Sequence, residues 1–300
     1  MSKHLILIAG PTASGKTSLA IHLAQELGSE IISADARQVF REMKIGTAMP
    51  TELELAAVPH HLVSHRSVTE PYDASDYGAE AEMTATTLFT RYDNLILCGG
   101  SGLYIKAFLE GLDTIPEVPD AIRKSLTDEY LEKGMEWLRQ NVLEADPAWY
   151  QTADTSNPRR LIRALEVYRA SGKPLSSFQS GTKKSHPFSV VKIGLDVPRD
   201  VLGGRIDRRV DQMVEAGLFE EAESLYPHRQ LPALQTVGYR EIFSYMEGQC
   251  NRKEAIALIR LHTRQYAKRQ MTWFRKDEDI NWFDPARPEA ILSHLRERIA

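Results

Sequence analysis

A glycine-rich segment near the start of the chain has the residue types and spacing of a phosphate-binding loop. Residues 10–17 read Gly-Pro-Thr-Ala-Ser-Gly-Lys-Thr, which fits the pattern G-x-x-x-x-G-K-[ST]. The glycines allow successive backbone N–H groups to converge on phosphate oxygens, and the N-terminus of a following helix adds a favourable dipole. We therefore expect Lys16 to reach a terminal phosphate and the Thr17 hydroxyl to hold Mg²⁺. The motif predicts a diphosphate or polyphosphate ligand and does not distinguish between the two.

The position of Asp35, directly after an apolar run, suggests a role for its carboxylate near the phosphate loop. Enzymes that hydrolyse ATP on such a loop usually place an Asp at the end of a neighbouring strand, where it helps to hold the metal. Here the apolar run 95–98 is followed by Gly-Gly-Ser-Gly, and the carboxylate instead follows an earlier apolar run, at Asp35. Because open α/β sheets bind ligands at the carboxyl ends of their strands, Asp35 is a candidate general base. The alternative interpretation is a loop aspartate that caps a turn.

Short apolar runs alternate with helical patterns over the first hundred residues. The strands expected there are residues 4–9, 30–34 and 94–98. A helix is expected over residues 15–27, with Gly28 as its end. This alternation predicts an α/β fold with a P-loop NTPase-like, doubly wound and mostly parallel sheet.

The strand signal disappears over residues 116–185, which are predicted to form a helical insertion domain. Asn157 followed by Pro158 is the pattern of a helix N-cap with proline at the first helical position. Residues 171–174 read Ser-Gly-Lys-Pro, the pattern of a helix end. The insertion therefore contains at least one well-delimited helix.

The remaining residues are assigned to the P-loop core. Its first part is residues 1–115, and its continuation is residues 186–300. The continuation begins with an expected strand over 190–197, is mostly helical over 200–275, and has a last short strand at 281–283.

Composition is ordinary for a globular protein, with 42% hydrophobic and 26% charged residues and a formal net charge of −4. No apolar run reaches the roughly 20 residues that span a bilayer, and no signal-peptide layout is present, so a cytoplasmic protein without membrane contact is expected. Cys98 and Cys250 have neither a disulfide framework nor metal-ligand spacing. The adjacent His60 and His61 are expected to have structural or substrate-lining roles and not to bind metal.

The net charge hides a local basic segment. Residues 260–276 carry six Lys or Arg side chains and no acidic one. Those that recur on one helical face are Arg260, Arg264 and Lys268. This stripe is either directed at phosphate groups or simply solvated. Ile259, Tyr266 and Trp273 lie on another face, and their spacing favours packing in the core over base stacking.

Together these segments resemble the tRNA dimethylallyltransferase (tRNA isopentenyltransferase) family over nearly the whole chain. The matching segments are GPTASGKT at 10–17, SADARQVF at 33–40, VPHHLV at 58–63, GGSGLYIKAFLEGL at 99–112, NPRRLIRALEVY at 157–168, RIDRRVDQMVEAGLFEEA at 205–222, QTVGYRE at 235–241 and RQYAKRQMTWFRK at 264–276. The phosphate loop alone is shared by many families, whereas these segments in this order are specific. The resemblance implies transfer of a dimethylallyl group from dimethylallyl diphosphate to the exocyclic amine of the adenosine 3′ of the anticodon, in tRNAs that read codons beginning with U. It also suggests a monomer.

The resemblance further implies roles for individual residues. The donor diphosphate is expected to be bound by Gly10, Pro11, Thr12, Ala13, Ser14, Gly15, Lys16 and Thr17. The implied catalytic set is Asp35 as general base, Ser101 as a hydroxyl beside the reaction centre and Arg209 as a diphosphate ligand opposite the loop. Contacts with the tRNA anticodon stem-loop are implied for Asp35, Ala36, Arg37, Gln38, Ser101, Arg123, Arg159, Arg160, Leu161, Ile162, Arg163, Gly238, Tyr239, Arg240, Arg264, Lys268 and Arg269. Ala36, Phe40 and Ser101 replace the usual serine, tyrosine and threonine.

Two other function classes are open from the residues alone. A small-molecule kinase would use the same loop, and Asp35 could serve as its base, but a metabolite kinase has no need of a long basic helix. A non-enzymatic RNA-binding or nucleotide-switch module would not need Asp35, Ser101 and Arg209 around the loop.

Overall fold

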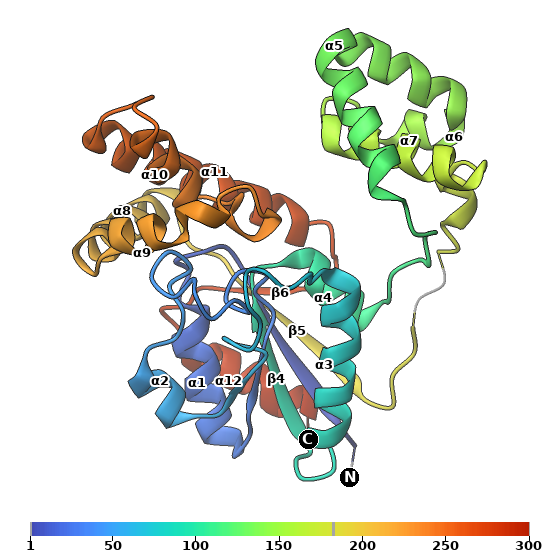
Figure 1. The fold of residues 1–300 in the computed structure, drawn as a ribbon. Helices are drawn as coiled ribbons and strands as arrows, with labels where there is room; N and C mark the ends of the chain where they lie inside the picture. Colours follow the sequence, from blue (N-terminus) through green and yellow to red (C-terminus); the bar gives the residue numbers. More distant parts are fainter. Residues whose placement is uncertain (1, 182–183, 300) are drawn as a thin grey trace. The chain divides into compact units, whose positions relative to one another are not determined.

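The computed structural model describes residues 2–181 and 184–299, and the chain divides into two compact units. The first unit comprises residues 1–110 and 185–300, and the second comprises residues 111–184. The described part of the first unit contains a sheet of six parallel strands in the order β3-β2-β4-β1-β5-β6 (Figure 1). The strands are β1 (His4–Ala9), β2 (Ile31–Ser33), β3 (His60–His61), β4 (Asn94–Gly99), β5 (Ser189–Leu195) and β6 (Asn281–Phe283). The predicted fold class is confirmed.

Strand β1 lies between β4 and β5 and is buried along its whole length. Successive side chains of a strand point to opposite faces, so an apolar run can serve two cores at once. Leu5 and Leu7 belong to the core on one face, and Ile6 and Ile8 to the core on the other. A continuous apolar run therefore marks this strand better than alternation would.

Helices cover both faces of the sheet. One core is closed by α1 (Lys16–Leu27) and α12 (Pro288–Ile299), which lie on the same face in Figure 1. The other core includes side chains of α3 (Ala74–Leu88) and α4 (Gly102–Leu109). The remaining helices of this unit are α2 (Glu52–Ala57), α8 (Arg199–Glu215), α9 (Leu218–Leu225), α10 (Tyr239–Met246) and α11 (Arg252–Phe274), with short 3₁₀ turns at Tyr226–His228 and Pro232–Leu234. This arrangement is doubly wound, as the alternating pattern predicts.

Most helices and strands that were predicted from the sequence begin and end within two residues of the predicted positions. Helix α1 ends at Gly28, which has a left-handed φ of 57°. Strand β2 is one residue shorter at each end than predicted, β5 begins one residue earlier and ends two residues earlier, and β6 is found at the predicted residues. The two-residue strand β3 and helix α2 were not predicted. Strand β3 has only two residues, both histidine, at the edge of the sheet. It therefore lacks the apolar run by which the other strands were predicted.

The second unit is helical throughout its described elements. These are α5 (Asp120–Ala145), α6 (Pro147–Thr152), α7 (Pro158–Ser171) and a 3₁₀ turn at Leu175–Phe178. The Asn157 side chain accepts a hydrogen bond from the backbone N–H of Arg159 at 3.1 Å, and Pro158 is the first helical residue. Helix α7 ends at Gly172, with a φ of 71°. The predicted start and end of this helix are thus confirmed.

Among the described helices, none combines the length and the apolar character required to cross a membrane.

Candidate active site

The phosphate loop connects the end of β1 to the start of α1, at the carboxyl ends of the strands. Gly10 and Gly15 have φ values of 152° and 95°, and Ala13 adopts a left-handed φ of 62°. A Cβ at Gly10 would lie 3.3 Å from the Leu195 carbonyl oxygen, so this position favours glycine on space as well as on φ. The Lys16 ammonium folds back over the loop and donates to the Pro11 carbonyl at 2.7 Å.

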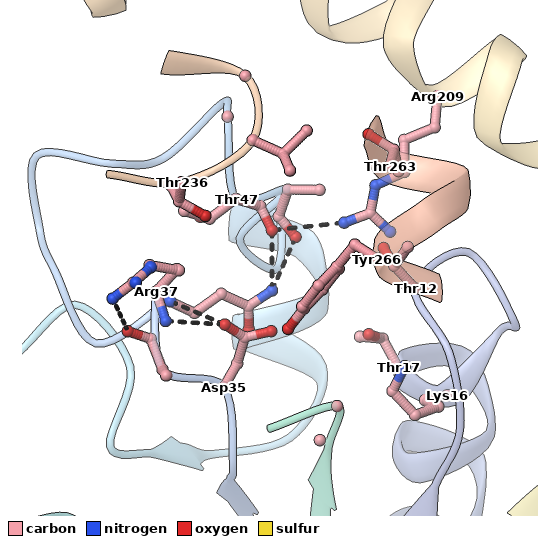
Figure 2. Close-up of a pocket in the computed structure, with 18 of the residues that line it drawn as sticks. Thr12, Lys16, Thr17, Asp35, Arg37, Thr47, Arg209, Thr236, Thr263 and Tyr266 are labelled. Atoms are coloured by element: carbon pink, nitrogen blue, oxygen red, sulfur yellow. Dashed lines mark hydrogen bonds between the residues drawn. The ribbon is translucent and has the colours of Figure 1, made fainter. Parts of the chain in front are cut away.

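A cavity of about 240 Å³ opens beside this loop within the first unit. Its polar lining comes from the loop, the segment after β2, strand β3, the segment before α10, and helices α8 and α11 (Figure 2). The polar residues include Thr12, Lys16, Thr17, Asp35, Arg37, Gln38, His60, Arg209, Thr236, Thr263, Tyr266 and Gln270. Its apolar lining includes Ile206, Val210, Met213, Leu218, Val237 and Ile259. One cavity therefore offers cations, a carboxylate and an apolar wall, which suits a ligand with a charged part and a hydrocarbon part.

Two of the basic residues in this cavity, Lys16 and Arg209, share it with the carboxylate of Asp35. Burial lowers the pKa of Lys16 to about 8; the charge of Arg209 acts in the same direction, and that of Asp35 opposes it. Burial likewise lowers the pKa of Arg209, again opposed by Asp35. Figure 2 shows Arg209 above Lys16 and Thr17, with Asp35 on the other side of the cavity. Closely placed cations in a sheltered cavity repel each other, so an anionic group bound beside Lys16 and Arg209 would be stabilised by both.

Asp35 combines the two interpretations that the sequence left open. Its Oδ1 accepts the backbone N–H groups of Arg37 and Gln38 at 2.9 and 3.3 Å, so it caps the turn after β2. The residue also lines the cavity (Figure 2). Capping holds the carboxylate in one orientation, as a general base requires.

Ser101 lies behind this turn and is not a lining residue of the cavity. Its Oγ accepts a hydrogen bond from the backbone N–H of Ala36 at 2.8 Å. Ser101 therefore supports the segment that carries Asp35, and its side chain also lies within hydrogen-bonding reach of Tyr266.

Tyr266 was predicted to pack in the core, and this prediction is wrong. The residue is 36% exposed and lines the cavity, where its ring lies between Asp35 and Thr17 in the view of Figure 2. Burial from bulk water, followed by the charge of Asp35, raises its pKa to about 12, so the hydroxyl stays protonated at neutral pH. Trp273, 45% exposed, also departs from the core prediction, whereas Ile259 is buried.

Helix α11 contributes a polar face that the sequence analysis missed. Thr263, Tyr266 and Gln270 follow the spacing i, i+3, i+7, and all three line the cavity. Gln270 is almost fully buried and joins two segments: its Oε1 accepts the backbone N–H of Thr12, and its Nε2 donates to the Gly100 carbonyl, each at 2.9 Å. The helical spacing of these polar residues was the available signal.

A second arginine of α8 also reaches the phosphate loop. Arg205 lies four residues before Arg209 and donates from Nη1 to the Ser14 carbonyl at 3.3 Å. Four-residue spacing on a helix was the signal that could have paired it with Arg209.

Apart from Ser101, the predicted tRNA-binding residues of the first unit fall into three groups. Asp35, Ala36, Arg37, Gln38 and Gly238 line the cavity. Lys268 and Arg269 are exposed, and Arg269 lies 5.8 Å from the centre of the Tyr266 ring. The third group is engaged within the protein: Tyr239 is fully buried, Arg240 lies 3.8 Å from Glu241, and Arg264 binds Asp207 at 2.6 Å.

Two of the three residues of the basic stripe form ion pairs with α8. Arg260 and Arg264 bind Asp211 and Asp207, which lie one turn apart on α8. Their charges are therefore largely balanced within the protein, and they join α11 to the helix that carries Arg209.

In the second unit, the predicted basic residues differ in their surroundings. Arg159 and Arg160 are exposed at the start of α7. Arg123 and Arg163 contact the buried carboxylate of Glu166 at 3.3 and 3.1 Å. Two further predicted residues lie on α7: Leu161, whose side chain is fully buried, and Ile162, which is half-buried. The Leu161 side chain supports α7 from inside and cannot itself touch RNA.

An all-parallel sheet with a phosphate loop after its central strand, and a charged cavity at the carboxyl ends, defines an α/β protein with a P-loop NTPase-like fold. The family model described as IPP transferase matches residues 38–277. The chain belongs to the IPP transferase family.

Individual relatives and solved structures agree. A tRNA dimethylallyltransferase of Cytophaga hutchinsonii is 44% identical over 299 residues, covering 100% of this chain and 98% of the relative. One of Christiangramia forsetii is 49% identical over 284 residues, covering 95% and 94%. The crystal structure of a tRNA isopentenylpyrophosphate transferase from Bacillus halodurans matches with a TM-score of 0.73 at 35% identity, covering 100% of this chain and 97% of that one. A eukaryotic dimethylallyltransferase captured acting on tRNA gives a TM-score of 0.76 at 25% identity, covering 94% and 74%. The predicted family is thus confirmed, and a small-molecule kinase is not favoured.

Proposed function

We propose that this protein is a tRNA dimethylallyltransferase. It transfers a dimethylallyl group from dimethylallyl diphosphate to the exocyclic amine of the adenosine 3′ of the anticodon, in tRNAs that read codons beginning with U, and it releases diphosphate. The observation that carries the proposal is the single cavity in which Lys16 and Arg209 lie opposite Asp35, with an apolar wall beside them. Membership of the IPP transferase family supports the same reaction.

The proposed reaction requires stabilisation of the leaving diphosphate and removal of a proton from the attacking amine. The allylic C–O bond breaks while a new C–N bond forms, so negative charge develops on the departing diphosphate. We assign the stabilisation of that charge to Lys16 and Arg209, which both line the cavity. Such stabilisation is usually the largest contribution to catalysis. The attacking amine is a poor nucleophile because its lone pair is delocalised into the adenine ring. Asp35 accepts its proton as the new bond forms, a contribution of about 10²–10⁴-fold.

Mg²⁺ fits as the cofactor, with Thr17 as its protein ligand. The Thr17 side chain lines the cavity next to Lys16 (Figure 2). In the described part of the chain, no group of three or more His, Cys, Asp or Glu residues is placed to hold a metal. Mg²⁺ usually takes only one or two ligands from a protein, so the Thr17 hydroxyl would be sufficient to hold it here together with the substrate. When bound, it would neutralise charge on the donor diphosphate.

The tRNA must present an unstacked adenine to so small a cavity, and an anticodon loop makes this less costly than a duplex. We assign the electrostatic part of tRNA binding to exposed basic residues, with Arg159 and Arg160 in the helical insertion and Lys268 and Arg269 on α11. The protein is proposed to act as a cytoplasmic monomer.

The reaction is tested by incubating the protein with tRNA, dimethylallyl diphosphate and Mg²⁺, and then measuring the mass of the adenosine next to the anticodon. We expect a gain of one dimethylallyl group. A parallel incubation with labelled ATP controls for phosphoryl transfer. Rapid ATP turnover with unmodified tRNA would overturn the proposal.

A further inference from the structure

We infer that Glu221 is a positioning residue for the diphosphate site, although it does not line the cavity. It lies on α9, and its carboxylate binds the loop formed by residues 44–48. The inference rests on the proposed function, because it concerns how the diphosphate ligand Arg209 is held.

The Glu221 carboxylate is saturated by donors from two segments. Oε2 accepts the backbone N–H groups of Lys44 and Ile45, both at 2.8 Å. Oε1 accepts the backbone N–H of Gly46 at 2.9 Å and the hydroxyl of Tyr239 at 2.7 Å. Three consecutive backbone N–H groups that converge on one anion fix the path of a loop, since each would need another partner if the anion left.

The fourth donor to Glu221, the Tyr239 hydroxyl, comes from the protein core. Its side chain is fully buried, and burial together with the charge of Glu221 raises its pKa, so it remains a hydrogen-bond donor. Its ring packs directly on the loop, because a Cβ at Gly46 would come within 2.6 Å of it. Tyr239 thus acts on the site through Glu221 and the loop.

The far end of the same loop faces the cavity, which residues 46–48 line. The Thr47 carbonyl accepts Arg209 Nη2 at 3.4 Å and Gln38 Nε2 at 3.2 Å, and the Ala48 carbonyl accepts Gln38 Nε2 at 3.1 Å (Figure 2). Glu221 therefore holds one end of a short loop. The other end of this loop orients Arg209, the proposed diphosphate-binding residue, and Gln38, a proposed contact of the adenosine.

The test replaces Glu221 by an amide of the same shape. In Glu221→Gln, the new NH₂ group faces N–H donors and cannot accept from them, so the loop loses up to two of its three bonds. We expect kcat/KM for dimethylallyl diphosphate to fall about 10–100-fold, because small misplacement of a reacting group has effects of this size. Binding of inorganic pyrophosphate, measured by calorimetry, weakens in parallel. Glu223→Gln, an exposed position on the same helix, is the matched control and stays at the wild-type level.

A double-mutant cycle separates positioning from a general loss of structure. If Glu221 acts through Arg209, then Glu221→Gln causes little further loss in an Arg209→Gln background. Equal losses in both backgrounds, or wild-type kinetics for Glu221→Gln, overturn the inference. Should Glu221→Gln fail to fold, Tyr239→Phe decides: we expect a smaller loss in the same direction, and unchanged kcat/KM contradicts it. Wild-type protein that leaves tRNA unmodified would instead contradict the proposed function, and pyrophosphate binding would still report on Glu221.

Discussion

The side-chain oxygen of Gln270 accepts a hydrogen bond from the backbone N–H of Thr12 at 2.9 Å. The same amide donates to the Gly100 carbonyl, so one residue of α11 joins the phosphate loop to the end of β4. Both contacts are sheltered, because Gln270 is only 6% exposed. A phosphate loop binds its ligand through the direction of its backbone N–H groups, and Gln270 holds the loop that carries them by its contact with Thr12.

Replacing Gln270 by Leu is expected to lower both stability and donor binding. The change leaves the Thr12 N–H and the Gly100 carbonyl without their partner, and each buried unsatisfied group costs about 1–3 kcal/mol. Urea unfolding measures the free-energy change, and steady-state kinetics measure the rise in KM for dimethylallyl diphosphate. Gln265→Leu, on the exposed face of the same helix, is the control. Equal stability of the two variants would show that the bridge is not needed.

Much of the fold follows from local patterns in the sequence. Residues 5–9 are all apolar because both faces of β1 are covered, so the burial of this strand can be recognised from its residue types. The start of α7 at Pro158 and its end at Gly172 reflect backbone preferences that act within a few residues. Strand β3 carries no such signal, because it exists only through pairing with β2.

The candidate site could be predicted only in part, because some of its residues act through contacts with distant segments of the chain. The phosphate loop and Asp35 are recognisable from spacing and from their position after strands. The contacts that Gln270 and Glu221 make are not, since each residue acts on a segment more than 150 residues away, with sequence separations of 258 and 177. Tyr266 was misassigned because an aromatic residue at helical spacing looks the same whether it faces a core or a cavity.

Asp35→Asn is expected to lower kcat by about 10²–10⁴-fold, the usual contribution of a general base. The asparagine keeps an oxygen that can accept the N–H groups of Arg37 and Gln38, so the turn is preserved. Single-turnover measurement of prenyl transfer and filter binding of tRNA distinguish chemistry from affinity. We expect tRNA affinity to change little. Near-normal turnover would remove Asp35 from its assigned role.

The pKa of Lys16, lowered to about 8 by burial, predicts a pH dependence. The side chain is charged below this pH and neutral above it, so kcat/KM for the donor falls as pH rises through 8, approaching tenfold per unit. The profile of kcat lies at higher pH, because bound diphosphate favours the charged form. In Lys16→Arg the guanidinium stays charged, and the alkaline fall is expected to vanish even though activity is lower. An unchanged fall in this variant would assign it to another group.

Tyr266 is expected to act mainly through its ring. We predict that Tyr266→Ala weakens tRNA binding by about 1–3 kcal/mol, the range for an aromatic side chain that stacks on a base. Tyr266→Phe keeps the ring and loses only the hydroxyl near Ser101, so most of the affinity remains. Binding of tRNA whose target adenosine is replaced by an abasic site provides the comparison. If Tyr266→Ala and Tyr266→Phe differ in affinity for the abasic tRNA as much as they do for the intact tRNA, the ring does not contact the adenine.

The surroundings of the basic residues predict which of them bind RNA phosphates. Each Lys or Arg that neutralises a phosphate contributes about one unit to the slope of log affinity against log salt. Arg159 and Arg160 are exposed at the start of α7, where the helix dipole also favours an anion. Replacing both by Gln is therefore expected to weaken tRNA binding and to reduce the slope by about two units.

Arg264 provides the contrast, because Asp207 already holds its guanidinium at 2.6 Å. A phosphate that bound this arginine would have to displace the carboxylate or approach its charge. Arg264→Gln is expected to leave the salt slope nearly unchanged and to affect the protein by loosening α11 from α8. Titrations of tRNA at several salt concentrations, together with thermal unfolding, separate the two effects. A slope reduced by a full unit in Arg264→Gln would show that tRNA replaces Asp207 as its partner.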